Sequence, residues 1–181
     1  WYFEAKQSAP GGLHVGIQPA GGTGYNAVNN GTSTPERYVL YDGGVIYHDG
    51  SSTSSVTPTF NDNADTDIVG CAVDLDNNKI YWHVNGTYIT YSSTQQNPNT
   101  STHGYSIVDP GDSANHETGF YSMLAITNGG GSDDGVAEVN FGNPSFSISS
   151  GNADANGYGN FEYAVPSGYF SLCTKNLAEY G

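Results

Sequence analysis

The stretch between residues 67 and 91 restricts the fold of this chain more than any other part of the sequence. Apolar side chains recur there at every second position, first at Val69, Cys71, Val73 and Leu75 and then at Ile80, Trp82 and Val84. Period-two alternation is typical of a strand with one buried face. An Asn-Asn pair separates the two runs, and Asn85-Gly86, a strong hairpin signal, follows the second. The sequence therefore predicts a three-stranded antiparallel meander with a core centred on Trp82, and with Tyr81 and His83 on the opposite face.

Short runs of the same kind occur along the whole chain. They are rich in β-branched and aromatic residues and are bounded by Gly, Asn, Asp, Ser or Pro. We expect strands at residues 1–6, 13–18, 38–41, 45–48, 67–76, 79–84, 88–91, 120–127, 136–141 and 169–174. The segments between them lack the length and the periodicity of crossover helices. The fold class that this organisation predicts is all-β, a two-sheet antiparallel β-sandwich.

The charge of the chain and the length of its apolar runs each exclude one class of partner. Lys6, Arg37, Lys79 and Lys175 are its only lysines and arginines, against 18 carboxylates, which gives a net charge of −14. Nucleic-acid binding needs basic side chains to displace counterions from phosphates, so we expect no nucleic-acid partner. No apolar run approaches the roughly 20 residues of a membrane span, so we expect no membrane insertion.

Metal sites and catalytic motifs are weakly supported. Two cysteines cannot form a zinc site alone, and the five histidines have no HxH or HExxH spacing. Calcium is the better candidate for a bound metal, at Asn152–Gly157 or at residues 61–67. An Asx-rich turn explains both segments as well, so we expect no cofactor. Asp74 and Asp76 have the spacing of a glycosidase acid pair but flank a hairpin turn. We therefore expect a protein that is not an enzyme.

Five motifs resemble the SPRY domain family in order and spacing. They are Trp1-Tyr2-Phe3-Glu4, Leu13 to Ile17, Tyr38 to Gly43, the hairpin from Asp67 to Gly86, and Val136 to Gly142, with Phe120 to Ala125 in the place of a further family strand. The resemblance implies a concanavalin-like jelly-roll sandwich over residues 1–146. Residues 147–181 would then form a C-terminal extension that packs on the same domain.

Two further observations concern the origin of the chain. The ending from Asn160 to Leu177 is similar to that of SPRY-containing structural proteins of tailed phages and marine viruses, which implies a virion protein exposed on an extracellular particle. SPRY sequences normally carry one or two strands before the Trp1 motif, so we expect a fragment or processed chain of a longer protein. A missing strand would leave an unpaired sheet edge for another chain.

The resemblance also implies binding through loops at one edge of the sandwich. The long polar connections contain Gly, Ser, Asn and Tyr, a mixture that suits recognition loops. The candidate binding residues are Tyr25, Tyr41, Asp42, Tyr47, His48, Tyr105, Asp112 and Asn115. The expected partner is a host surface glycan or protein, bound by a tail fibre, spike or capsid-surface protein that forms a homo-oligomer. Two alternatives remain open: an assembly subunit that contacts only neighbouring virion proteins, and a carbohydrate-active enzyme.

Overall fold

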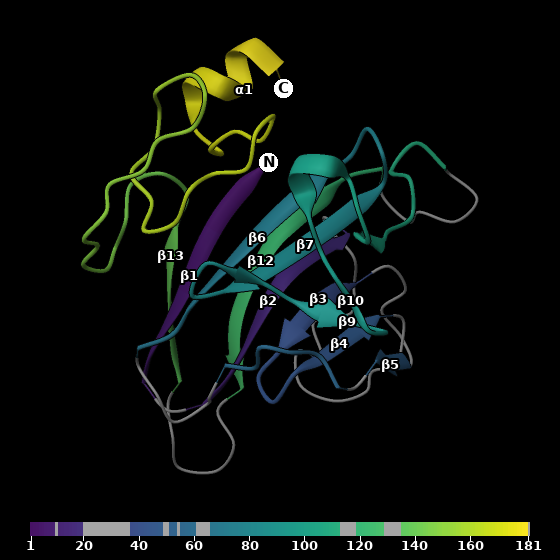
Figure 1. Cartoon of the computed structure of the whole chain (residues 1–181). Helices are drawn as coiled ribbons and strands as arrows, with labels where there is room; N and C mark the ends of the chain where they lie inside the picture. Colours follow the sequence, from purple (N-terminus) through teal and green to yellow (C-terminus); the bar gives the residue numbers. More distant parts are fainter. Residues whose placement is uncertain are drawn as a thin grey trace.

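Two antiparallel sheets packed face to face make up the body of the molecule (Figure 1). The computed structural model describes residues 1–9, 11–19, 37–48, 51–53, 55–60, 66–112, 119–128 and 135–180. The expected two-sheet β-sandwich is therefore confirmed. Within the described residues, no helix is long and apolar enough to cross a membrane.

The first sheet contains the meander expected from the sequence. Its strand order is β11 (Tyr105–Ser106), β7 (Lys79–Val84), β6 (Ile68–Asp74), β1 (Tyr2–Ala9) and β13 (Val136–Asn140), with β8 (Thr87–Tyr88) also paired to β7. The register places Cys71 opposite Trp82 and Val73 opposite Ile80, so the alternating apolar residues share one face. Asn85 and Gly86 have φ of 49° and 80°, as the hairpin turn between β7 and β8 requires.

The second sheet has the order β12 (Tyr121–Asn128), β2 (Gly12–Pro19), β3 (Tyr38–Tyr41), β4 (Val45–His48) and β5 (Ser51–Thr53). A small separate hairpin joins β9 (Thr90–Tyr91) to β10 (Thr94–Gln95). The only helices in the described part of the chain are the short 3₁₀ turn η1 (Pro98–Thr100) and α1 (Thr174–Tyr180).

The core between the sheets is centred on Trp82, as the alternation predicted. Its side chain is fully buried, and its indole N–H donates to the carbonyl of Val15 in the other sheet at 2.9 Å. The buried side chain of Gln96 accepts from the Trp82 backbone N–H at 2.8 Å. Cys71 is a buried, unpaired cysteine of this core, and burial raises the pKa of its thiol.

A second apolar cluster lies on the outer face of the first sheet, under the C-terminal segment. Its buried members are Tyr2, Ala72, Tyr81, Phe161 and Tyr169. The segment also reaches β1 through the backbone, because Tyr2 N–H donates to the carbonyl of Phe170 at 2.9 Å. Residues beyond 146 thus cover apolar surface of the sandwich, whereas the domain boundary at residue 146 stays a prediction.

One expected strand is wrong. Residues 169–174 contribute a single parallel bridge, between Ser171 and Tyr2, and α1 begins at Thr174. The reason is local: Cys173 N–H turns back to the carbonyl of Ser171 at 2.8 Å, and Leu177 N–H donates to Cys173 at 2.9 Å. Tyr169 packs on the second cluster, but the backbone of this segment does not join a sheet.

Candidate functional site

The structure separates the residues expected at the binding surface. Tyr25 and Asn115 lie outside the described residues. Tyr41 and Tyr47 project from the outer face of the second sheet, because Tyr41 is in register with His14 and Tyr47 with Val39, which alternate with core residues. His48 pairs with Tyr38, a core residue, and therefore points to the inner side.

On the outer face, Tyr41 and Tyr47 pack around His14. The Tyr41 and His14 ring centroids are 4.4 Å apart, and those of Tyr41 and Tyr47 are 5.8 Å apart. His14 is 4% exposed, and burial, followed by the charge of Arg37, lowers the pKa of its imidazole to about 4. The two tyrosines are thus partly occupied in covering a neutral histidine.

The two acidic candidates have different settings. Asp42 is buried in the turn between β3 and β4. Asp112 is half-buried in a turn in which its N–H donates to the carbonyl of Asp109 at 2.9 Å. Of the pair, Asp112 is the more accessible to a partner.

On the inner side, four rings form one continuous row across the gap between the sheets. We call His48, Tyr105, Tyr91 and His103 the aromatic row; all four are half-buried. The ring centroids are 6.0 Å apart for His48 and Tyr105, 5.6 Å for Tyr105 and Tyr91, and 4.1 Å for Tyr91 and His103. The row contains two of the expected residues and adds Tyr91 and His103, which the sequence analysis missed.

The aromatic row rests on fixed supports. Tyr38 is buried beneath His48, with the rings nearly parallel and 4.4 Å apart, and the Tyr38 hydroxyl accepts from Val108 N–H at 3.0 Å. The Tyr121 hydroxyl donates to the Val108 carbonyl at 2.9 Å. The segment that carries Tyr105 is therefore held to the second sheet while β11 pairs with β7 in the first.

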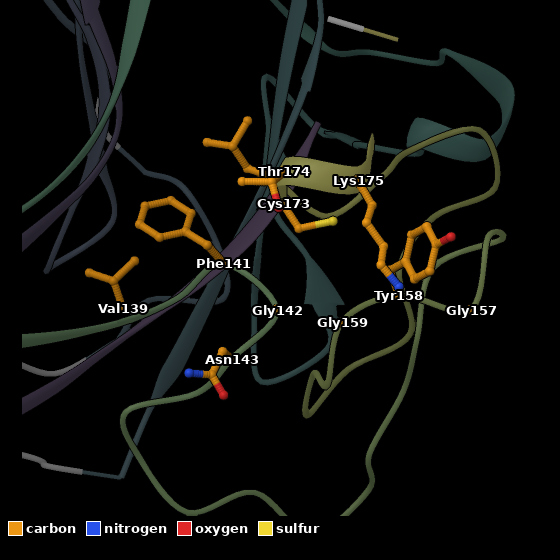
Figure 2. A pocket seen from close by; sticks show the side chains of 11 residues that line it. Val139, Phe141, Gly142, Asn143, Gly157, Tyr158, Gly159, Cys173, Thr174 and Lys175 are labelled. Atoms are coloured by element: carbon orange, nitrogen blue, oxygen red, sulfur yellow. The ribbon is translucent and has the colours of Figure 1, made fainter. Parts of the chain in front are cut away.

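A separate pocket of about 680 Å³ opens between the end of β13 and the C-terminal segment (Figure 2). Its walls are mainly apolar, and its charged lining residue is Lys175, whose ammonium lies 4.7 Å from the centroid of the Tyr158 ring. Burial by itself would raise the pKa of the Cys173 thiol, but hydrogen bonds from Asn176, Ser171 and Lys175 hold it below its usual range. None of the described residues that line this pocket carries a carboxylate.

In the calcium candidate at residues 152–157, N–H and O–H groups of the protein donate hydrogen bonds to the Asp154 carboxylate. Asp154 Oδ1 accepts from Asn156 and Tyr158 N–H, and its Oδ2 accepts from the backbone and hydroxyl of Ser171 and from the Asn176 amide, all at 2.7–2.9 Å. This is an Asx-centred turn in which both carboxylate oxygens are engaged. The candidate at residues 61–67 falls largely outside the described residues, among which no group of three or more His, Cys, Asp or Glu is placed to hold a metal.

These features define an antiparallel β-sandwich with a preformed aromatic surface at the gap between its sheets. A match to the SPRY domain family covers residues 1–103, more than half of the chain, and the chain belongs to that family. SPRY domains generally mediate protein–protein recognition and are typically noncatalytic. Three residues of the aromatic row lie within the match, and Tyr105 follows two residues after it. No curated protein matches the chain.

Proposed function

We propose that this chain is a noncatalytic recognition module that binds a protein partner through the aromatic row. The observation that carries the proposal is the row itself, four adjoining, half-buried rings. His48 and Tyr105 lie on strands of the two sheets, Tyr91 lies on the separate hairpin of β9 and β10, and His103 lies in a loop. Aromatic side chains supply most of the binding energy at many interfaces, since each offers a large apolar area together with a polar edge. Rings that are already fixed lose little conformational freedom on binding.

The electrostatics of the surroundings favour a neutral or basic partner segment. The chain carries −14 overall, and Asp109 and Asp112 lie just beyond Tyr105. Lys79 lies on β7 opposite Ser106 of β11, and its ammonium donates to the Ser106 hydroxyl at 2.7 Å. A basic side chain beside the row would find complementary charge, which mainly accelerates association.

The virion setting forms part of the proposal and rests on the C-terminal resemblance to viral structural proteins. A module on a tail fibre, spike or capsid surface would bind a host surface protein. A host glycan remains the alternative ligand, because tyrosine and aspartate side chains suit both. Contact with neighbouring virion proteins is favoured by one specific observation: β13 and β5 form sheet edges with no further strand paired in the described residues.

A peptide selection tests the binding surface. Peptides selected from a random library displayed on yeast would be measured against the wild type, Tyr105→Ala, His48→Ala and Tyr180→Ala. We expect the first two changes to weaken binding by about tenfold or more, the cost of losing one important interface side chain. Tyr180 is an exposed tyrosine of α1, far from the row (Figure 1), and its removal should leave binding unchanged. Selected peptides that are indifferent to Tyr105 and His48 would refute the surface.

Labelling of intact particles tests the setting. Antibodies against the chain should decorate purified virions at their tips or outer surface, and light scattering should give a homo-oligomer for the isolated protein. A chain that is absent from particles refutes the virion assignment but leaves the peptide result untouched.

A further inference from the structure

The pocket of about 680 Å³ in Figure 2 takes its walls from three separate stretches of the chain. They lie within residues 139–143 at the end of β13, residues 157–159, and residues 172–175 at the start of α1. The volume is within the range of small-ligand sites, roughly 300 to 1,000 Å³. No residue of the aromatic row lines this pocket, so it is a site apart from the row.

One side of the pocket is apolar. Figure 2 shows Val139 and Phe141 on that side, opposite Lys175. The Phe141 side chain is 38% exposed, although its ring packs on the buried ring of Phe3 with centroids 5.5 Å apart. An exposed phenyl ring beside a valine in a concave site offers apolar area that a ligand can remove from water.

The polar groups of the pocket are donors of hydrogen bonds. In the part of the chain that the structure describes, the Lys175 ammonium forms no ion pair and lies 4.7 Å from the centroid of the Tyr158 ring. The Asn143 amide and the Thr174 hydroxyl make no hydrogen bond with a described residue. The Asp154 carboxylate acts on the pocket only from behind its lining, and both of its oxygens already accept hydrogen bonds. The pocket is therefore suited to an anionic group.

We propose that this pocket binds a small organic monocarboxylate, with its alkyl or aryl body on Val139 and Phe141 and its carboxylate on Lys175. A hydrogen bond between an ammonium and a carboxylate is stronger than one between neutral groups. A purely apolar ligand would cover the ammonium without giving it a partner, which is costly. A phosphate monoester carries about −1.5 to −2 at neutral pH, too much for a single lysine in a chain of net charge −14. The proposal does not depend on the aromatic row.

Titration calorimetry with acetate, butyrate, octanoate and octanol tests the two halves of the pocket. We expect the affinity for carboxylates to rise with chain length, by up to about fourfold for each methylene that becomes buried. Octanoate should bind about tenfold or more tighter than octanol, the effect of one hydrogen bond between charged groups. Octylammonium should not bind, because Lys175 repels it.

Cys173 reports where the carboxylate binds. Of the two cysteines in the chain, Cys173 lines the pocket and Cys71 is fully buried in the core. Hydrogen bonds hold the pKa of the Cys173 thiol below its usual range, which favours the reactive thiolate. Alkylation by iodoacetamide, a neutral reagent, is followed by mass spectrometry. We expect octanoate to slow alkylation of Cys173 in proportion to the occupancy measured by calorimetry.

Two lysine variants separate the local contact from net charge. Lys175→Met keeps a long side chain and should weaken octanoate binding by about tenfold while leaving octanol binding unchanged. Lys79→Met is the matched control, because it changes the net charge equally but lies on β7 and does not line the pocket. It should bind octanoate like the wild type. The proposal is overturned if octanoate does not bind or does not protect Cys173, if octanol or octylammonium binds as tightly, or if both variants weaken binding equally.

Discussion

At the scale of single residues, a buried chain of hydrogen bonds on the outer face of the first sheet fixes the protonation of His83. Gly86 N–H donates to Nδ1 at 3.2 Å, so that nitrogen carries no proton. Nε2 then carries it and donates to the Tyr2 hydroxyl at 2.7 Å, which donates in turn to Glu4 at 3.0 Å. Glu4, fully buried, also accepts from the backbone of Glu162 and Tyr163 at 3.0 and 2.9 Å. The chain therefore ties the C-terminal segment to the sheet.

Two tyrosines beside His83 make a matched pair for testing this chain. The Tyr2 hydroxyl has two buried partners, whereas the buried Tyr88 hydroxyl has none among the described residues. We expect Tyr2→Phe to lower the free energy of unfolding by about 1–3 kcal/mol, because it leaves His83 and Glu4 short of a partner. Tyr88→Phe should be neutral or stabilising, because it removes an unsatisfied buried group. Denaturant unfolding measures both, and equal losses would contradict the assigned hydrogen bonds.

The burial of His83 makes stability depend on pH. Burial lowers the pKa of its imidazole from 6.5 to about 3, so the unfolded chain takes up a proton before the folded chain does. Stability is therefore complete above about pH 6.5 and falls as the pH drops toward 3, by up to about 1.4 kcal/mol per pH unit for this group. His83→Gln should reduce that slope in urea unfolding between pH 4 and 6.5, while Tyr88→Phe keeps it. An unchanged slope in His83→Gln would show that His83 is not the group responsible.

At the scale of elements, the turn between β7 and β8 connects the sandwich to the C-terminal segment. Gly86 has φ of 80°, and a Cβ at this position would lie 2.7 Å from the Tyr163 ring. Gly43 has φ of 70° in the turn between β3 and β4, and nothing lies within 4 Å of its added Cβ. The two glycines thus share a backbone conformation but differ in their surroundings.

Alanine at the two glycines separates backbone strain from contact. Gly43→Ala should cost about 1–2 kcal/mol, the price of a left-handed conformation for a residue with a Cβ. Gly86→Ala should cost clearly more, because the Tyr163 ring must also shift from its contact with the His83 ring. Thermal unfolding of both variants checks the order. Equal costs would mean that Tyr163 adapts freely.

How well the sequence predicts an element depends on why apolar residues occur in it. In β6 and β7 the alternation reflects a buried inner face, so strands, register and the position of Trp82 could all be predicted. Residues 169–174 are rich in aromatic and apolar residues without alternating, and Tyr169 packs on an apolar cluster, which a bent backbone satisfies as well as a strand does. The expected strand at residues 88–91 divides in two: Thr87 and Tyr88 pair with β7, and Thr90 and Tyr91 pair with β10.

The binding surface was only partly predictable for a similar reason. Tyr47 and His48 are adjacent in sequence, but neighbours along a strand point to opposite faces, so they cannot share one surface of the sheet. Tyr91 and His103 join the aromatic row through β9 and a loop residue with φ of 55°. Histidine adopts a positive φ more often than most residues other than glycine, but the conformation is still uncommon, so the sequence around residue 103 does not predict it.

At the scale of the whole molecule, the sandwich is built around two apolar clusters and needs its C-terminal segment to cover the second. Phe161 and Tyr169 pack on Tyr2, Ala72 and Tyr81, and all five are nearly or fully buried. Without that segment the outer face of the first sheet would expose two large tyrosines and the Glu4 carboxylate. Family matching ends at residue 103, so sequence comparison alone gives no sign of this dependence.

A chain ending at residue 146 should therefore fail to reach the stability of the full protein. Burial of each large aromatic side chain contributes about 1.5–3 kcal/mol, and domains have only about 5–15 kcal/mol in total. We expect the shortened chain to bind a hydrophobic dye, to aggregate and to melt well below the intact chain. A chain ending at Asn176 is the control: it keeps the Asn176 hydrogen bond to Asp154 and removes the exposed side chains of Leu177 and Tyr180, so it should lose little. If residues 1–146 melt at the same temperature as the full chain, the segment is an independent addition, and the hydrogen bonds it makes to Glu4 contribute no net stability.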